Sequence, residues 1–442
     1  MPDDVPPKRP CAAVVAAVAA ACAAGAWFTL HALQQDFAAY WIAATARRLG
    51  LDPYVNQVGS ANAPALWDGV ALFRHSRFLY PPLAADLFRP LAALPYATAK
   101  GLFTAAMLAA WIGAGLLVVD RGRPDAARGR AVFFLASALF FPFYRHLERG
   151  QIDLLLLLWL VIAWRERARP WVAGAALAAS VAFKPTLAGL LPVAWACGRG
   201  RSALAALAAG AALIGLTALV DGPARLGEYL REVLPRAALY GEGGTEEMLL
   251  PAARFSANES RLGANDGSAS GDIDDGTTRL DGRRYQTAIG DAPAAASLPR
   301  LLAPAAPSPA STRLPFLLAT GGLTAIARRL RCRAGAGDET AEALLFWAAA
   351  VACVVTSPAG WVMGLVLALP LAPLAARLVA EGRLPRGPAV AGALAWIAVA
   401  LPAPAPGWAA LAGSALIVAA VVAAALAARA AAGPAARGPV PR

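Results

Sequence analysis

The sequence has little charge. Of its 442 residues only 15% are charged, whereas a soluble domain carries about 25%. Hydrophobic residues make up 58% of the chain, and its mean hydropathy is +0.53. Because so few polar residues cannot cover the surface of a water-soluble fold of this size, the composition predicts a polytopic membrane protein.

Lysine is scarce among the basic residues. The net charge is +12, and of the 40 basic residues only Lys8, Lys100 and Lys184 are lysines. In a soluble protein this charge would suggest a nucleic-acid partner. Here the arginines form short clusters between apolar runs, which is typical of membrane topology, so the pattern argues against nucleic acid.

The usual signs of a disulfide, a metal or a cofactor are missing. The five cysteines form no CxxC pair. We find no P-loop, zinc signature or GxSxG elbow. The acidic stretch 272–276 resembles a calcium loop, but Gly271, Ile273 and Gly282 stand where ligands are required. The sequence therefore predicts no bound metal and no cofactor.

Apolar runs dominate what is present. A span requires about 20 apolar residues, and arginine-rich loops mark the cytoplasmic side. Together these rules predict about twelve membrane helices with both termini in the cytoplasm: 11–33, 98–119, 131–143, 152–164, 171–183, 186–197, 202–220, 313–328, 342–355, 361–378, 388–401 and 407–428. The first run could be a cleaved signal peptide, but it is longer than such a segment usually is, which favours an uncleaved helix.

Four of these runs are too short to cross a bilayer. Each has about 13 residues, or roughly 20 Å of helix. A polar bend, Tyr144 to Gln151, separates the first pair, and Lys184-Pro185 separates the second. They predict two short hairpins under an outward-facing cavity. The alternative is that 171–197 is one tilted, kinked helix, and the basic clusters at both its ends favour the hairpin.

The topology divides the chain into five parts. They are a cytoplasmic tail (1–10), a catalytic membrane half (11–220) with a first outer loop (34–97), a second outer loop (221–312), C-terminal membrane helices (313–428) and a second tail (429–442). In the second outer loop, the runs 263–282 and 292–310 predict little order. We find no internal repeat of the kind that inverted-repeat transporters show.

Candidate site residues gather on the predicted outer face. Asp36 follows the first helix, and it either caps the next helix or takes the proton from an attacking hydroxyl. Lys184 either snorkels to the interface or places a point charge on a phosphate.

The other hairpin tip carries three basic residues. Arg145, His146 and Arg149 either anchor the interface or supply positive charge for an anionic lipid head group. Tyr80 precedes two prolines in an extended turn and could face the cavity. In the second outer loop, an amide, a hydroxyl and a charge come from Asn258, Ser260 and Arg261.

Short motifs in a fixed order resemble glycosyltransferase family 87 over about residues 27–380. The motifs are Asp36-Phe37 with Tyr40, Gly50-Leu51-Asp52-Pro53-Tyr54, Leu79-Tyr80-Pro81-Pro82-Leu83, Gly150-Gln151-Ile152-Asp153, Ala182-Phe183-Lys184-Pro185-Thr186, Asn258-Glu259-Ser260 and Ser357-Pro358-Ala359-Gly360-Trp361.

The resemblance implies an all-α membrane fold of the C type and a polyprenyl-phosphate sugar donor, typically of mannose. It implies that Asp36 is the general base. Taken together, the residue positions and the resemblance give these substrate-binding candidates: Tyr40, Tyr80, Arg145, His146, Gln151, Lys184, Asn258, Ser260, Arg261 and Trp361. The chain departs from the family pattern where Asp153 replaces a frequent asparagine, where Glu259 replaces a frequent glutamine, and where no histidine follows Trp361.

We therefore expect an inverting, multi-pass glycosyltransferase of the inner or plasma membrane, with its active site facing the periplasm or the outside. Its partners would be the lipid-phosphate donor, a lipid or glycan acceptor and the membrane. One alternative is a lipid or glycolipid transporter, or flippase, whose basic tips bind a head group. Another is an inactive assembly subunit, because the histidine after Trp361 is absent.

Overall fold

The computed structural model describes residues 12–54, 78–120, 122–237, 277–280, 283–286, 296–302, 309–334, 338–357, 360–402, 404–405 and 407–431. Its elements are α1 (Ala12–His31), α2 (Gln35–Arg48), α4 (Pro82–Leu87), η1 (Leu91–Ala93), α5 (Tyr96–Leu117), α6 (Ala126–Ala138), α7 (Phe141–Arg149), α8 (Asp153–Arg165), α9 (Pro170–Phe183), η2 (Pro185–Gly189), α10 (Leu190–Ala196) and α11 (Gly200–Asp221). They continue with α12 (Pro223–Glu228), η3 (Tyr229–Val233), α13 (Leu234–Ala237), β1 (Thr277–Leu280), β2 (Arg283–Gln286), α15 (Leu298–Leu302), α16 (Pro309–Ala334), α17 (Glu339–Val355), η7 (Val362–Ala368), α18 (Leu371–Ala380), α19 (Arg386–Ala400) and α20 (Trp408–Ala431).

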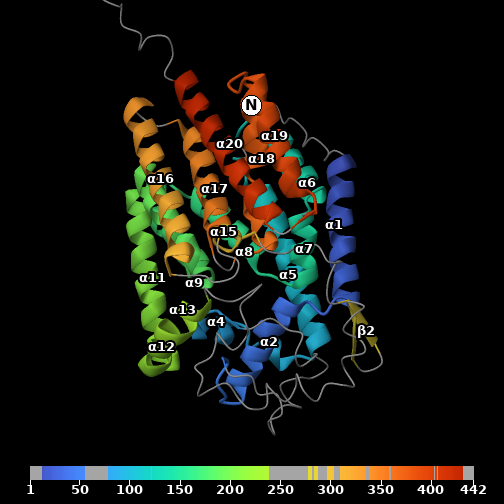
Figure 1. Cartoon of the computed structure of the whole chain (residues 1–442). Helices are drawn as coiled ribbons and strands as arrows, with labels where there is room; N and C mark the ends of the chain where they lie inside the picture. Colours follow the sequence, from blue (N-terminus) through green and yellow to red (C-terminus); the bar gives the residue numbers. More distant parts are fainter. Residues whose placement is uncertain are drawn as a thin grey trace, which may run out of the picture.

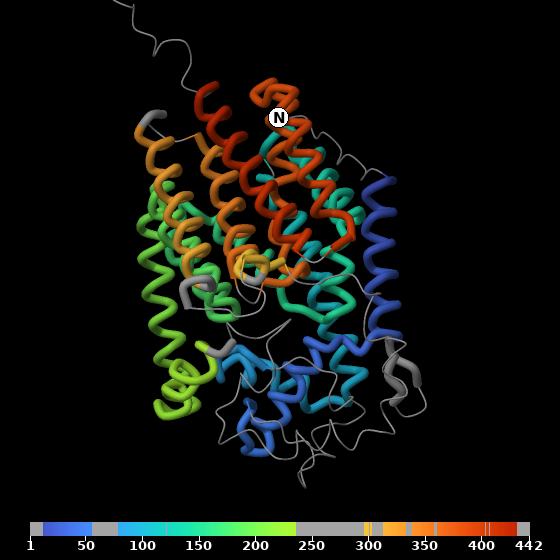
Figure 2. Tube along the Cα trace, viewed as in Figure 1, coloured from blue at the N-terminus to red at the C-terminus, as the bar shows by residue number. Residues whose placement is uncertain are grey.

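The apolar runs are helices, as predicted, because a helix satisfies its own backbone hydrogen bonds in lipid. Five of the described helices are long and apolar enough to cross a membrane: α1, α5, α11, η7 with α18, and α20. The bent pair α6–α7 could be a sixth. The chain is therefore a multi-pass membrane protein, and among its described residues the candidate full-length spans are fewer than the twelve helices predicted. Within the bundle α1 and α11 lie at opposite edges (Figure 2).

The arginine-rich loops lie together at one end of the bundle, which we call the arginine end. Arg199 pairs with Glu342 at 3.0 Å, and Arg167 pairs with Glu339. Both carboxylates belong to the first turn of α17, so the segment from α9 to α10 begins and ends at the same end of the bundle. It is a hairpin, as predicted, and the single kinked helix is excluded.

The first short hairpin differs from the prediction. The segment Tyr144 to Gln151 was expected to be a bend, but most of it belongs to helix α7, which ends at Arg149. The chain bends earlier, by 65° between α6 and α7. Arg165, at the end of α8, lies 4.0 Å from Asp120, so this hairpin also returns to the arginine end.

The segment predicted to form the second outer loop contains short elements that the runs of low predicted order did not suggest. Strands β1 and β2 pair antiparallel with Thr277 opposite Gln286. Helix α15 lies in the alanine- and proline-rich run.

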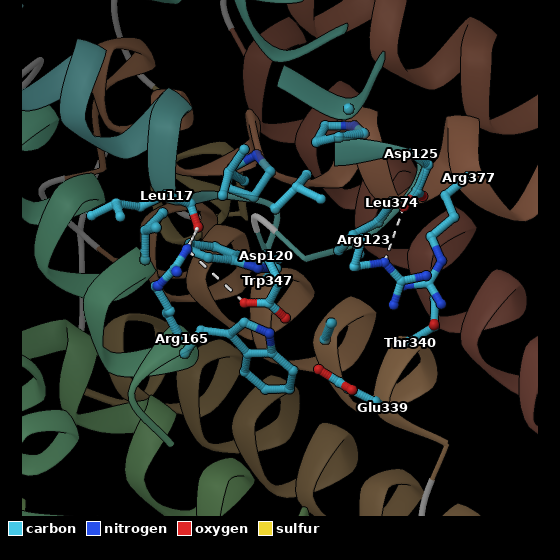
Figure 3. Close-up of a pocket in the computed structure, with 18 of the residues that line it drawn as sticks. Leu117, Asp120, Arg123, Asp125, Arg165, Glu339, Thr340, Trp347, Leu374 and Arg377 are labelled. Atoms are coloured by element: carbon cyan, nitrogen blue, oxygen red, sulfur yellow. Dashed lines mark hydrogen bonds and ion pairs between the residues drawn. The ribbon is translucent and has the colours of Figure 1, made fainter. Parts of the chain in front are cut away.

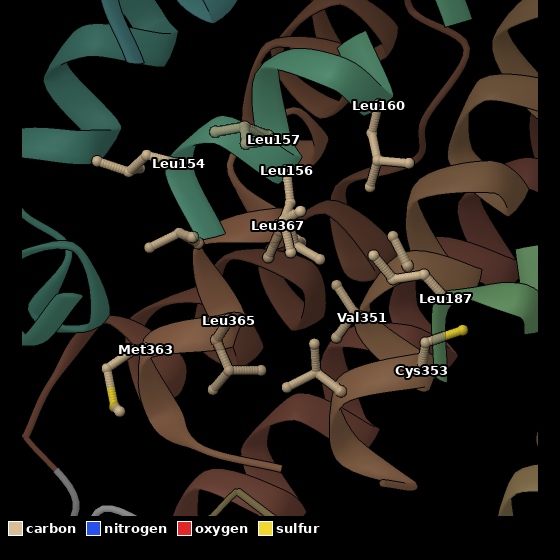
Figure 4. Close-up of a cluster of buried hydrophobic side chains, with 14 of the residues drawn as sticks. Leu154, Leu156, Leu157, Leu160, Leu187, Val351, Cys353, Met363, Leu365 and Leu367 are labelled. Carbon is tan, nitrogen blue, oxygen red and sulfur yellow. The ribbon is translucent and has the colours of Figure 1, made fainter. Parts of the chain in front are cut away.

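Helix α17 forms the centre of the bundle. Its residues are buried almost without exception, and it packs against α20, α16 and η7. Leucines of α8 and residues of η7 complete the apolar cluster around Val351 and Cys353 (Figure 4). This cluster gives α8 and η7 a fixed position, and both elements also contact the candidate site.

Helices α2, α4 and α12 lie at the other end of the bundle, which we call the site end (Figure 1). There Arg47 of α2 lies 3.3 Å from Asp86 of α4 and also pairs with Asp221, the last residue of α11. These ion pairs join the short helices to the membrane helices.

Candidate active site

A left-handed turn at Gln34 places the first turn of α2. Gln34 has φ +55°, the left-handed conformation that residues other than glycine seldom adopt. The turn is held by its neighbours, because Lys100 Nζ donates to Ala32 O at 2.8 Å and Gln34 Nε2 donates to Leu147 O at 3.0 Å. The next turn of chain then carries Asp36, which is 5% exposed.

Gly150 brings α7 against this turn. It has φ +68° and ends α7 in the left-handed conformation that favours glycine. A Cβ on Gly150 would lie 2.8 Å from Phe37 Cβ and 2.9 Å from Gln34 Cβ. Only glycine allows this approach, and the approach places the preceding residue, Arg149, beside α2.

Arg149 and Asp36 form a two-pronged ion pair. Arg149 Nε donates to Asp36 Oδ2 at 3.0 Å, and Arg149 Nη2 donates to Asp36 Oδ1 at 3.2 Å. The third nitrogen, Nη1, donates to Gln35 Oε1 at 2.5 Å. The planar guanidinium therefore fixes the plane of the carboxylate, as a parallel pair of hydrogen bonds does.

Tyr40, Tyr80 and Gln151 come together next to this pair. The Tyr40 and Tyr80 hydroxyls are 2.7 Å apart, and the Tyr40 hydroxyl donates to Gln151 Oε1 at 3.3 Å. The hydroxyl of Tyr54 donates to Tyr80 O at 2.7 Å and holds the turn before the two prolines. Three predicted site residues from distant parts of the chain thus form one polar cluster.

The phenols in this cluster stay protonated. Burial raises the pKa of Tyr40 far above its ordinary value, and Tyr80 and Asp36 raise it further. Burial likewise raises the pKa of Tyr80. Asp153 also contributes to the shift at Tyr40, so Tyr40 lies within electrostatic range of two carboxylates on different helices.

Lys184 and Asp153 form the second ion pair of the site. Lys184 ends α9 and Asp153 begins α8, and Lys184 Nζ lies 2.7 Å from Asp153 Oδ1. The lysine side chain is 20% exposed and the carboxylate only 3%. A Cβ on Gly364 of η7 would lie 2.9 Å from Lys184 Nζ, so η7 borders this pair as well.

Arg145 and His146 lie deeper than the sequence suggested. Arg145 Nη1 donates to Glu148 Oε2 at 2.8 Å, and both side chains are buried. His146 is 0% exposed and its Nε2 accepts the backbone N–H of Leu154 at 3.2 Å. Their contacts in this structure are with α7 and α8.

The remaining predicted residues are placed only in part. Trp361 is half-buried at the start of η7, a segment that packs against α7 and α8. Three predicted substrate-binding residues lie outside the described residues: Asn258, Ser260 and Arg261.

Sequence reasoning missed the partners in the two ion pairs. Arg149 was considered as an interface anchor or as positive charge for a head group, and Asp153 as part of a family motif from which it departs. The available signal was position, because each lies within two residues of Gly150 or Gln151, at the junction of two short apolar runs.

A pocket lies at the arginine end, and Asp36 is not among the residues that line it. Arg123, Asp125, Arg165 and Glu339 are among its lining residues (Figure 3). The pocket is lined by apolar side chains and by paired charges, among them Arg123 with Asp125 at 3.1 Å. At its edge burial acts to raise the pKa of Glu381, but hydrogen bonds from Arg377 and Arg383 outweigh burial and lower it. Arg123 also lies 3.8 Å from Glu381 at the end of α18, and Arg167 pairs with Glu339 of α17. These two pairs join the ends of the first hairpin to α18 and α17, which gives the pocket walls a structural role.

Metal ligands do not cluster in the described part of the chain. No group of three or more His, Cys, Asp or Glu residues there is arranged to hold a metal ion.

Comparison with known proteins identifies a family. Residues 78–262 match the family model described as glycosyltransferase family 87. The matched region includes Tyr80, Arg149, Gln151, Asp153 and Lys184, and it ends just after the Asn258 to Arg261 segment. No curated protein matches the chain. This match, together with the membrane helices, supports membership of glycosyltransferase family 87 and indicates a membrane glycosyltransferase.

Proposed function

We propose that the protein is an inverting glycosyltransferase that moves a sugar, mannose, from a polyprenyl-phosphate donor to a hydroxyl of a lipid or glycan acceptor. In this proposal the helices form a C-type glycosyltransferase fold, and the site end faces the extracytoplasmic side. Family membership supports glycosyl transfer. The arginine clusters at the opposite end support the orientation, because such clusters mark the cytoplasmic side.

The proximity of two charged pairs to one polar cluster carries the proposal, because Asp36 and Asp153 both act electrostatically on Tyr40. Asp36 lies one helical turn before Tyr40, and Asp153 follows two residues after Gln151. Tyr40 and Gln151 are hydrogen-bonded to each other. A sugar held by this cluster would have a carboxylate near one side and the Lys184 ammonium near the other.

The residues would then act in a single nucleophilic displacement at the anomeric carbon. The acceptor hydroxyl oxygen attacks the anomeric carbon and gives its proton to the Asp36 carboxylate, acting as general base. The bond between the anomeric carbon and the phosphate oxygen breaks with its electron pair, and polyprenyl phosphate leaves. Inversion requires base and leaving group on opposite faces of the sugar, as in inverting glycosidases.

Lys184 would stabilise the leaving phosphate, on which negative charge increases in the transition state. To do so its ammonium must share its contacts between Asp153 and the phosphate, which its three donors allow. Tyr40, Tyr80, Gln151 and Trp361 would bind the sugar.

Five further residues would contribute in other ways. Asn258, Ser260 and Arg261 would contact substrate from the second outer loop. Arg145 and His146, which are buried behind Arg149, would need to move before they could reach a head group.

A reconstituted assay tests the proposal. The purified protein in lipid nanodiscs is incubated with polyprenyl-phosphate [³H]mannose and a lipid extract as acceptor, and labelled glycolipid is measured. We expect transfer with inversion at the anomeric carbon by the wild type, and none by Asp36→Asn at an unchanged thermal unfolding midpoint. Asp125→Asn, at the arginine end, is the matched control and should transfer normally. Wild-type transfer by Asp36→Asn would remove Asp36 as the base.

A further inference from the structure

Among the described residues, three ion pairs lie on α7 or at the junctions of α2, α8 and α9 that form the candidate site, and they differ in accessibility. Arg145 and Glu148 are sealed, with side-chain exposures of 5% and 2%. The Lys184 and Arg149 side chains are 20% and 17% exposed. Two cations can therefore reach a substrate in this structure, and they belong to two different carboxylates.

Arg149 holds Asp36 more completely than charge pairing alone requires. Three of its nitrogens contact two consecutive side chains, Gln35 and Asp36, in the first turn of α2. Lysine cannot reproduce this fork, because its ammonium is a point charge without a fixed plane. Gly150 and the turn at Gln34 set the distance between α7 and α2. The backbone therefore holds Arg149 where its guanidinium can form this forked contact.

The chemistry of inversion separates the roles of the two cations. Base and leaving group lie on opposite faces of the sugar. A guanidinium bound to both oxygens of the base therefore lies on the acceptor side of the sugar. The donor phosphate is then bound by the cation of the other pair. Of the two accessible cations in these pairs, Lys184 is the one that is not bound to Asp36.

We propose that Arg149 is a positioning residue that orients Asp36 and keeps it ionised for proton abstraction, and that it does not bind the donor phosphate. The proposal rests on the proposed function, because it assigns Arg149 a part in that reaction. In surroundings of low dielectric constant an opposite charge is what keeps a carboxylate ionised. Other described groups that interact electrostatically with Asp36 include Tyr40, Tyr80, Arg145, His146 and Glu148.

Kinetics separate positioning from phosphate binding. For Arg149→Gln we expect kcat to fall by about 10²-fold while the donor KM stays within about 2-fold, the pattern of an interaction that acts on the transition state. The acid limb of the activity–pH profile should move to higher pH, because the carboxylate has lost its cation. Arg149→Lys restores charge without the fork, so it should recover the acid limb but only part of kcat.

A control variant tests whether any lost arginine has this effect. Arg89→Gln removes a half-exposed arginine that lies 3.6 Å from Asp86 at the site end. Its kcat, donor KM and pH profile should equal those of the wild type. A raised donor KM with unchanged kcat in Arg149→Gln would overturn the proposal and assign Arg149 to the phosphate. An acid limb identical to that of the wild type would overturn it as well.

A second readout needs no sugar transfer. A hydrophobic carbodiimide reacts with protonated carboxyl groups, and mass spectrometry locates the adduct. We expect labelling of Asp36 in the donor-free protein to be greater in Arg149→Gln than in the wild type, with Arg149→Lys close to the wild type. Equal labelling in all three proteins would refute the positioning role. Absence of transfer by the wild type would refute the proposed function, so the two failures are distinguishable.

Discussion

Replacing Gly150 by alanine tests the contact that brings Arg149 to Asp36. The substitution has two separable effects. It places a Cβ on a residue with φ +68°, and it pushes that Cβ to within 2.8 Å of Phe37 Cβ and 2.9 Å of Gln34 Cβ. The first effect is a backbone cost, and the second acts on the distance between α7 and α2.

The magnitudes follow from the two effects. A left-handed conformation costs a residue other than glycine about 1–2 kcal/mol. Overpacking adds about 1–3 kcal/mol. Carbon atoms pack best about 3.5–4.0 Å apart, so relieving the overlap requires α7 to move from α2 by about 1 Å. A displacement of about that size in a catalytic arrangement can lower the rate by about 10²-fold.

The assay compares Gly150→Ala with Gly382→Ala in nanodiscs. Gly382 has φ +66°, and nothing lies within 4 Å of its would-be Cβ, so it carries the backbone cost alone. We expect both variants to lower the thermal unfolding midpoint, Gly150→Ala more than Gly382→Ala, and only Gly150→Ala to lose transfer activity. Equal midpoints, or wild-type transfer by Gly150→Ala, would refute the reasoning that the close approach sets the site.

The other predictions concern the second ion pair, the polar cluster and the arginine end. Lys184→Gln should raise the donor KM and lower kcat, because the leaving phosphate loses its cation. Asp153→Asn should lower the donor KM in the same assay, because the ammonium no longer shares its contacts with a carboxylate. Tyr80→Phe removes the 2.7 Å hydrogen bond to Tyr40 and should cost about 1 kcal/mol of stability, measured by denaturant unfolding. The pKa of Glu381 lies below its ordinary value of 4.5. The stability that this carboxyl contributes is therefore present above pH 4.5 and is lost as the pH falls through the lower pKa of the folded protein. If the thermal unfolding midpoint of Glu381→Gln declined on acidification as much as that of the wild type, this prediction would be contradicted.

Much of the fold could be predicted from the lengths of the apolar runs. The runs 152–164 and 202–220 correspond to α8 and α11 within two residues at each end. Run length predicts these helices well because, in lipid, an apolar segment must satisfy its own backbone hydrogen bonds, and a helix does so. The arginine clusters also placed the chain ends of both hairpins together.

The segment around α7 shows where polarity misleads. Arg145, His146 and Glu148 suggested a bend at a water boundary, yet the structure buries all three in a helix. Each has a partner in α7 or α8, and a paired polar group can stay inside a bundle. Sequence polarity alone does not reveal such partners.

The candidate site could be predicted one residue at a time but not as pairs. Asp36 and Lys184 were recognised from their positions at helix ends. Their partners were not, since Asp36 and Arg149 are 113 positions apart and no local pattern links them. Only the approach of α7 to the left-handed turn makes the pairing visible.

The turn at Gln34 also imposes an order on biogenesis. Its carbonyl and amide groups depend on Lys100 in α5 and on Leu147 in α7, which are translated 68 residues after Ala32 and 113 residues after Gln34. A nascent chain that has emerged only as far as α2 therefore holds the turn without these two hydrogen-bond partners, and Asp36 without its cation. We expect α1 and α2 to acquire their final arrangement only once α7 has entered the membrane, so the N-terminal part of the site is among the first to be synthesised and among the last to be completed.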